Sequence, residues 1–138
     1  MKPAAVTLAM SFVIGALPVA ARACDYKAVS RGQWQCASQG RTASETANLC
    51  DEAAHAVESC AGEHTGAAHF HFMRMDAQLY ESAVPHLIHL HAKADARRFL
   101  AIAIDLNTLV ASSSATTAGE RSLARSAIAA DRRLFLSL

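Results

Sequence analysis

Histidine is the residue type with the clearest capacity for chemistry in this chain. The sequence contains seven histidines, and six of them lie between residues 64 and 91. Imidazole is a common ligand of Zn, Cu and Ni. On a helix, His86 and His89 lie about 60° apart and can share one ion, whereas His91 lies about 160° from His89. The spacing therefore predicts His86 and His89 as a pair of metal ligands. Candidates for a further ligand are His55, His64, His69, His71, Asp76 and Glu81.

Two other interpretations of the histidines stay open at this stage. Histidine is amphipathic, and the cluster also fits half-exposed residues beside an apolar stripe, with His91 at the edge of that stripe. Clustered imidazoles would in addition gain charge together below about pH 6.5, which is the behaviour of a pH sensor.

The four cysteines, Cys24, Cys36, Cys50 and Cys60, form the second reactive set. They contain no C-x-x-C motif and their spacing matches no zinc finger, so the sequence predicts structural disulfides. Cys50 and Cys60 on one helix would be about 15 Å apart. A disulfide needs Cα atoms within about 7 Å, which disfavours that bond. The nested pairing, Cys24–Cys60 with Cys36–Cys50, is favoured because it clamps an antiparallel hairpin, and the crossed pairing, Cys24–Cys50 with Cys36–Cys60, remains open.

Residues 1–23 have the pattern of a signal peptide. Lys2 is followed by an uncharged apolar run over residues 4–17, then by Pro18 and an A-x-A cleavage site that ends at Ala23. Cleavage there would leave residues 24–138 as a single helical domain that is periplasmic or secreted, a compartment in which disulfides persist. Two alternatives are an uncleaved membrane anchor and lipidation of Cys24.

The sequence lacks the common catalytic and cofactor motifs. There is no G-x-S-x-G, P-loop, H-E-x-x-H or glycine-rich dinucleotide loop, so we expect neither an enzyme nor a bound cofactor. Removing Lys2 and Arg22 with the leader leaves eleven Lys/Arg against twelve Asp/Glu, a net charge of −1. This balance argues against nucleic acid as a partner. After the leader no apolar run reaches membrane length, so no membrane span is expected in the mature chain.

The composition favours helix throughout, because alanine is abundant and glycine and proline are scarce. Helical spacing of apolar residues predicts helices at about 26–36, 42–60, 67–91, 95–112 and 118–138, the first of them weak. The predicted fold is therefore all-α: a small bundle of four to five helices with a disulfide-clamped N-terminal helical hairpin.

Local signals set the expected helix ends. Thr42 and Thr117 are each followed three residues later by Glu, the pattern of a capping box. Gly62 is expected to end the second helix. Pro85 is expected to kink or split the third helix, with a boundary near Ser82.

Side-chain burial can also be predicted from the pattern. Trp34 is expected to pack in the core, as is most of the Met/aromatic patch at residues 70–75. The arginines of the last helix are expected to form a solvated face. Its apolar side should consist of Leu123, Ala124, Ala127, Ile128, Leu134, Phe135 and Leu138.

Two functions follow as expectations. The first is an exported helical protein that acts by protein–protein interaction, as an accessory subunit, inhibitor or adaptor for an unidentified protein partner. The alternative is a periplasmic protein that binds or senses a divalent transition metal (Zn, Cu or Ni) through His86 and His89.

Overall fold

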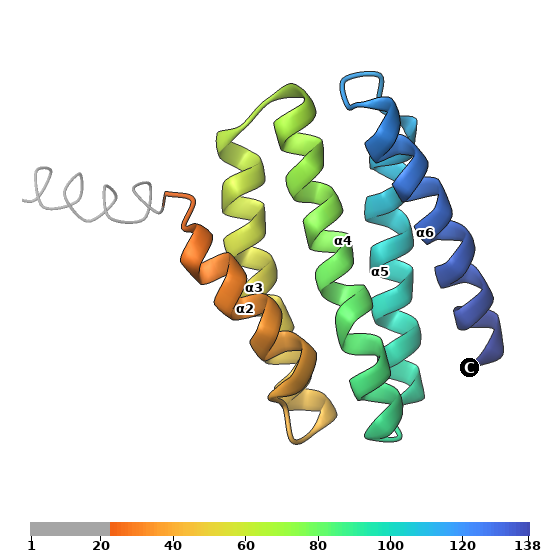
Figure 1. Ribbon diagram of the computed structural model, residues 1–138. Coiled ribbons are helices and arrows are strands. Elements are labelled where there is room, and N and C mark those ends of the chain that lie inside the picture. The colour runs from red at the N-terminus through yellow and green to blue at the C-terminus, as the bar shows by residue number, and fades with distance from the viewer. Residues whose placement is uncertain (1–22) are drawn as a thin grey trace, which may run out of the picture.

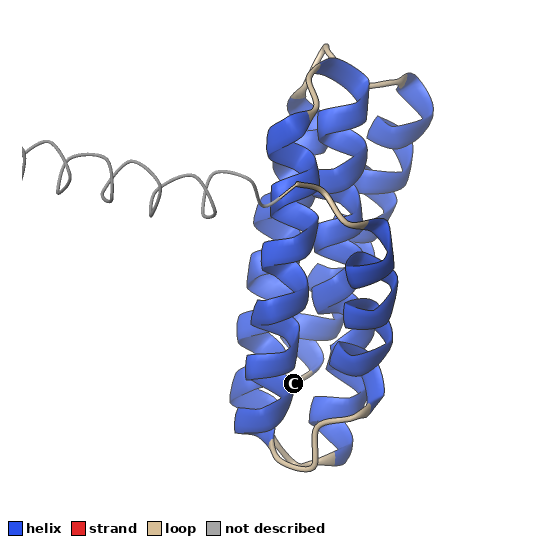
Figure 2. Ribbon diagram, turned by 90° about the vertical axis from the view of Figure 1, so that its left-hand side faces the viewer, coloured by secondary structure: helices blue, strands red, loops and turns tan. Residues whose placement is uncertain are grey.

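A computed structural model describes residues 23–138 of the chain and places five helices in them. These are α2 (Tyr26–Ser38), α3 (Ala43–Glu63), α4 (Gly66–His89), α5 (Lys93–Ser112) and α6 (Ala118–Ser137). The expected signal peptide, apart from Ala23, lies outside the described residues. Each helix packs against the next, and α4 also contacts α2 and α6, so it forms the middle of the bundle (Figure 1). The helices run along one long axis with the connecting loops at its ends (Figure 2), which confirms the predicted all-α bundle.

The first helix is complete rather than weak. Asp25 is its N-cap, and its carboxylate accepts hydrogen bonds from the backbone N–H groups of Lys27 and Ala28. Gly32 does not interrupt the helix; it faces α3, where an added Cβ would come within 2.7 Å of the Ala53 Cβ. The missing side chain therefore permits the close approach of α2 and α3.

Both predicted threonine caps are present. The hydroxyl oxygens of Thr42 and Thr117 accept from the N–H groups three residues later. The Glu45 carboxylate accepts from the backbone N–H of Arg41 rather than from that of the cap residue. The return bond of the capping box is thus displaced by one residue at the start of α3.

Gly62 does not end α3, which continues to Glu63, so that prediction was wrong. The helix ends instead where His64 turns to an extended conformation. The ring of His64 bonds to the Cys60 carbonyl through Nδ1 at 2.7 Å, which satisfies a carbonyl in the last turn. Side-chain capping by His64 replaces the glycine stop that the sequence suggested.

Pro85 lies inside α4, and the helix is continuous through Ser82. The expected boundary was therefore wrong. Proline removes one backbone donor, but its neighbours Ala83, Val84 and Leu87 are all buried in the core. Packing of these residues outweighs the loss of one hydrogen bond and keeps α4 in one piece.

The disulfides are Cys24–Cys60 and Cys36–Cys50, with Cα–Cα distances of 4.4 and 4.5 Å. This confirms the nested pairing and the clamped α2–α3 hairpin. The crossed pairing is not formed. Two disulfides in a small helical domain fit an oxidising compartment.

The main core surrounds α4 and joins both halves of the bundle. It includes Leu79, Tyr80 and Leu87 of α4 and Phe99 and Leu100 of α5. The Tyr80 and Phe99 rings meet edge to face, with centroids 5.1 Å apart. A smaller cluster around the first disulfide consists of Val29, Val57, Cys60, Ala61 and Phe72.

Helix α6 matches its predicted apolar side only in part. Only Ala124 and Asp131 are buried along it, and Leu123 and Leu134 are exposed. Phe135 packs against the edge of the core from the last turns. Few apolar residues therefore attach α6 to the bundle, and polar side chains of α6 also contact α4 and the end of α5.

Within residues 23–138, no helix combines the length and the apolar character that crossing a bilayer requires.

Candidate functional site

His86 and His89 both lie in the last turn of α4. The Nε2 atom of His86 is 2.5 Å from the Gly40 carbonyl, so this ring links α4 to the loop between α2 and α3. His89 is exposed. Across residues 23–138, no three His, Cys, Asp or Glu side chains are grouped so as to hold a metal ion. The pair is thus placed side by side as expected, and metal binding through it stays a prediction.

The remaining histidines serve separate local contacts. His69 bonds to the Ala61 carbonyl through Nδ1, and His71 bonds to the Glu120 carboxylate of α6, both at 2.7 Å. His55 faces Glu58 within α3 at 3.6 Å. The described structure therefore does not bring these rings to His86 and His89.

His91 ends α4 by adopting a left-handed backbone with φ 59°. The N–H of Ala92 donates to the Leu87 carbonyl at 2.9 Å, and the N–H of His91 donates to the Ile88 carbonyl at 3.0 Å. These two bonds form a Schellman motif, in which glycine is the usual residue at the left-handed position. The role of His91 in the described structure is thus to turn the chain into α5.

Trp34 projects from the bundle, contrary to the prediction that it packs in the core. Its side chain is 61% exposed, and Tyr26 on the same helix is 60% exposed. The buried side of α2 is formed by Val29, Gly32 and Cys36. Because Trp34 lies about 160° from Cys36 around the helix axis, the cysteine position could have revealed this orientation.

Basic residues accompany the two aromatic residues on α2. Lys27 and Arg31 are exposed, and Arg31 precedes Trp34 by one helical turn. The sequence of α2 contains no Asp or Glu. We call Tyr26, Lys27, Arg31 and Trp34 the α2 surface; it combines large aromatic side chains with positive charge.

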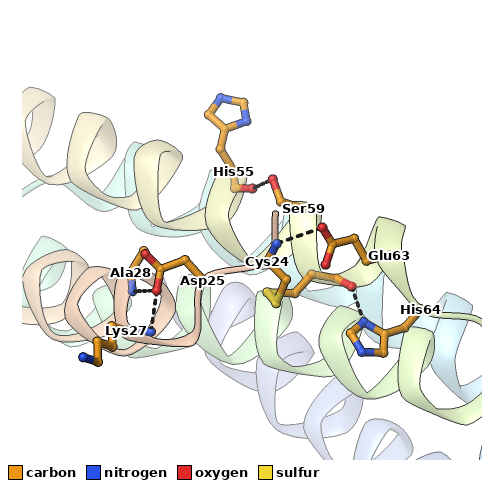
Figure 3. Close-up of a disulfide and its surroundings, with 9 residues drawn as sticks. Cys24, Asp25, Lys27, Ala28, His55, Ser59, Glu63 and His64 are labelled. Atoms are coloured by element: carbon orange, nitrogen blue, oxygen red, sulfur yellow. Dashed lines mark hydrogen bonds between the residues drawn. A yellow bond between two sulfur atoms is a disulfide. The ribbon is translucent and has the colours of Figure 1, made fainter. Parts of the chain in front are cut away.

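The α2 surface rests on a helix that is fixed at both ends. The Cys24–Cys60 bond links the residues just before the first turn of α2 to α3, and Figure 3 shows this disulfide at Cys24. The Cys36–Cys50 bond holds the last turn of α2. The backbone N–H of Cys24 also donates to the Glu63 carboxylate at 2.9 Å (Figure 3). The covalent links therefore restrict the motion of α2 relative to α3.

A second feature is a pocket between α3, α4 and α5, with a volume of about 320 Å³. Its walls are mostly apolar and include Phe72, Met73 and Leu106. Asp76 also lines it, although only 4% of this residue is exposed, and its Oδ1 atom has no hydrogen-bond partner within the described part of the chain. Burial, and secondarily the negative charge of Glu58, raise the pKa of Asp76 to about 7.

The sequence analysis predicts Asp76 only as a possible further metal ligand. Its position four residues from both Phe72 and Tyr80, which lie on the buried side of α4, was the signal that it faces inward. An acidic residue on an apolar stripe is a candidate for a functional group, because burial without a partner is costly.

A third feature is a buried polar network between α4, α5 and α6, which the sequence did not reveal. Arg74 donates to the Asn107 side-chain oxygen at 3.1 Å, and the Asn107 amide donates to Glu81 at 2.8 Å. Arg74 also lies 3.6 Å from the Glu81 carboxylate. Burial, followed by a hydrogen bond with Glu81, raises the pKa of Asp131. The network holds the polar side of α6 against the bundle.

Comparison with known proteins found no matching family model, no matching curated protein and no matching solved structure. The fold and its disulfides define the class: an all-α bundle with a doubly disulfide-bonded N-terminal hairpin. The α2 surface, the histidine pair and the pocket are the features of this class member that could carry a function.

Proposed function

We propose that the chain is an exported, non-enzymatic protein that acts by binding another protein, as an accessory subunit, inhibitor or adaptor. The observation that carries the proposal is the exposure of Trp34 on a helix held by two disulfides. The partner would present an acidic surface with an apolar centre, complementary to the α2 surface.

The residue types of the α2 surface support this proposal. Trp, Tyr and Arg are the residues that most often contribute large shares of binding energy in protein interfaces. Leaving a tryptophan in water forgoes the roughly 1.5–3 kcal/mol gained by burying a large apolar side chain. Because disulfides already restrict α2, binding would require little further ordering of its backbone. Lys27 and Arg31 would steer an acidic partner toward Trp34.

Quantitative cross-linking and capture from the native envelope fraction tests the proposal. Wild-type protein is compared with Trp34→Ala and with Leu123→Ala, a matched control on α6 whose leucine is 58% exposed. We expect a partner that is lost with Trp34→Ala and kept with Leu123→Ala, and whose recovery falls with Arg31→Glu and with added salt. The proposal would be contradicted if no partner is recovered, or if recovery of the partners is unchanged by Trp34→Ala.

Export is a separate part of the proposal and has its own test. Mass spectrometry of the protein from its native source should find a mature chain that begins at Cys24 and carries both disulfides. A chain that retains residues 1–23 would instead support the membrane-anchor alternative.

The alternative function is binding of Zn, Cu or Ni by His86 and His89, favoured by their positions in one helical turn. An ion would use the exposed His89 and the Nδ1 atom of His86, since Nε2 of His86 is bonded to Gly40. Calorimetric titration with each metal should give micromolar binding that is lost in the His86→Ala, His89→Ala double variant. An absence of heat at high protein concentration would end this alternative.

A further inference from the structure

The pocket between α3, α4 and α5 is lined by a buried carboxyl group. The Oδ1 atom of Asp76 has no hydrogen-bond partner among residues 23–138, although the residue is almost fully buried. A buried carboxyl oxygen without a partner destabilises the folded protein, and more so when the group is charged. A ligand that donates a hydrogen bond to this carboxyl group would offset that cost.

The charges around the pocket determine which kind of hydrogen-bond donor a ligand can carry. Glu58 of α3 lines the same pocket and adds a second negative charge. The negative charges of Asp76 and Asp51 act on Tyr80 of α4, and the positive charge of Arg98 of α5 acts on it in the opposite direction. His69 lines the wall, with its Nδ1 bonded to the Ala61 carbonyl. An anion is disfavoured by the two carboxyls, and a cation gains from both.

The rest of the wall is apolar, and the pocket is small. Phe72, Met73 and Leu106 offer aromatic, thioether and aliphatic contacts from α4 and α5. Aromatic, thioether and aliphatic side chains all pack favourably against an apolar substituent. The volume of about 320 Å³ is at the lower end of the range for small-molecule sites, about 300–1,000 Å³.

We propose that this pocket binds a small organic monocation: an ammonium group with an apolar substituent. The ammonium group donates to the carboxylate of Asp76 and lies within the field of Glu58, and the substituent packs against Phe72, Met73 and Leu106. The site is separate from the α2 surface and does not depend on the function proposed for it.

The pH dependence of binding follows from the same groups. In the free protein, burial raises the pKa of Asp76 to about 7, so the carboxyl is partly protonated at neutral pH. An ammonium ion binds to the carboxylate, and its affinity should therefore rise between pH 6 and pH 8.

The experiment uses the oxidised protein and three probes, hexylamine, hexanol and hexanoate, which share the same chain length and differ in their end group. Binding is followed at pH 6 and pH 8 by calorimetry and by amide chemical shifts. We expect hexylamine to bind at least about tenfold more tightly than hexanol at pH 8, and hexanoate not to bind. The shifts should map to α3, α4 and α5 around Asp76.

Substitutions then distinguish binding in the pocket from non-specific attraction of the amine to negative charge. Asp76→Asn should weaken hexylamine about tenfold and leave hexanol unchanged, and Glu58→Gln, an exposed position, should weaken hexylamine about threefold. Asp105→Asn removes the same charge from an exposed position on α5 and should have no effect. Equal affinities for hexylamine and hexanol, or equal loss with Asp76→Asn and Asp105→Asn, would overturn the proposal.

Discussion

Asp76 should make the folded protein less stable as the pH rises, and Asp76→Asn should remove that effect. Burial raises the pKa of this carboxyl from 3.8 to about 7 in the folded state. Between these values the unfolded chain has released its proton and the folded chain still holds it. The stabilising contribution of the protonated form is therefore complete below pH 3.8 and is lost as the pH rises through about 7. This is opposite to the usual behaviour of a salt-bridged aspartate.

The size of the effect follows from the two pKa values. One unit of pKa shift corresponds to about 1.4 kcal/mol, so the shift of Asp76 corresponds to roughly 4 kcal/mol over the whole range and roughly 2–3 kcal/mol between pH 5 and pH 8. The pKa of Asp131 is raised as well, so the wild-type slope contains both carboxyls. The difference between wild type and Asp76→Asn isolates the part that belongs to Asp76.

Urea unfolding of the oxidised protein, followed by circular dichroism at pH 5 and pH 8, measures this difference. Asp76→Asn should be more stable than wild type at pH 8. The free energy of unfolding of Asp76→Asn relative to wild type should be roughly 2–3 kcal/mol lower at pH 5 than at pH 8. Asp105→Asn serves as the control, because its carboxylate is exposed and its curve should run parallel to that of wild type. Parallel curves for wild type and Asp76→Asn would refute the assigned burial and ionisation of Asp76.

Other changes test the packing of α2 and the helix ends. Replacing Cys36 and Cys50 with Ala should lower the free energy of unfolding by roughly 3 kcal/mol, because the bond joins residues 14 apart in the unfolded chain; an unchanged urea midpoint would contradict this. Gly32→Ala should destabilise by about 1–3 kcal/mol, since its Cβ would meet α3 at 2.7 Å. Gly62→Ala has open space and should stabilise by about 0.5–1 kcal/mol, so equal effects of the two alanines would be inconsistent with the packing. His91→Gly should stabilise by about 1 kcal/mol by relieving the left-handed backbone, and a lower melting temperature would count against it.

The parts of the fold that depend on local spacing were predictable. Cys50 and Cys60 are ten positions apart, which is too great a distance on one helix for a disulfide, and this alone removes one pairing. Thr42 and Thr117 act through N–H groups within the next turn, so their caps depend only on nearby sequence. The number and approximate ends of the helices followed from the same short-range information.

The parts that depend on packing between helices were not predictable. Pro85 breaks an isolated helix, but here buried neighbours on α4 hold it. Trp34 is an exception: its apolar character favours the core, but its spacing from Cys36 already indicates that it points away from α3. Asp131 joins Glu81 across two helices that are far apart in sequence, and no spacing rule connects such residues. The pocket at Asp76 likewise exists only because three helices leave it open.

The nested disulfides have a consequence for the order of maturation. If the chain is exported N-terminus first, as proposed, Cys24 and Cys36 enter the oxidising compartment before their native partners. A bond between consecutive cysteines would join Cys24 to Cys36, which the folded protein does not contain. Such a bond must be exchanged by attack of a later thiolate, for which disulfide isomerases are the natural catalysts. The yield of native protein should therefore depend on isomerase supply more than on oxidant supply.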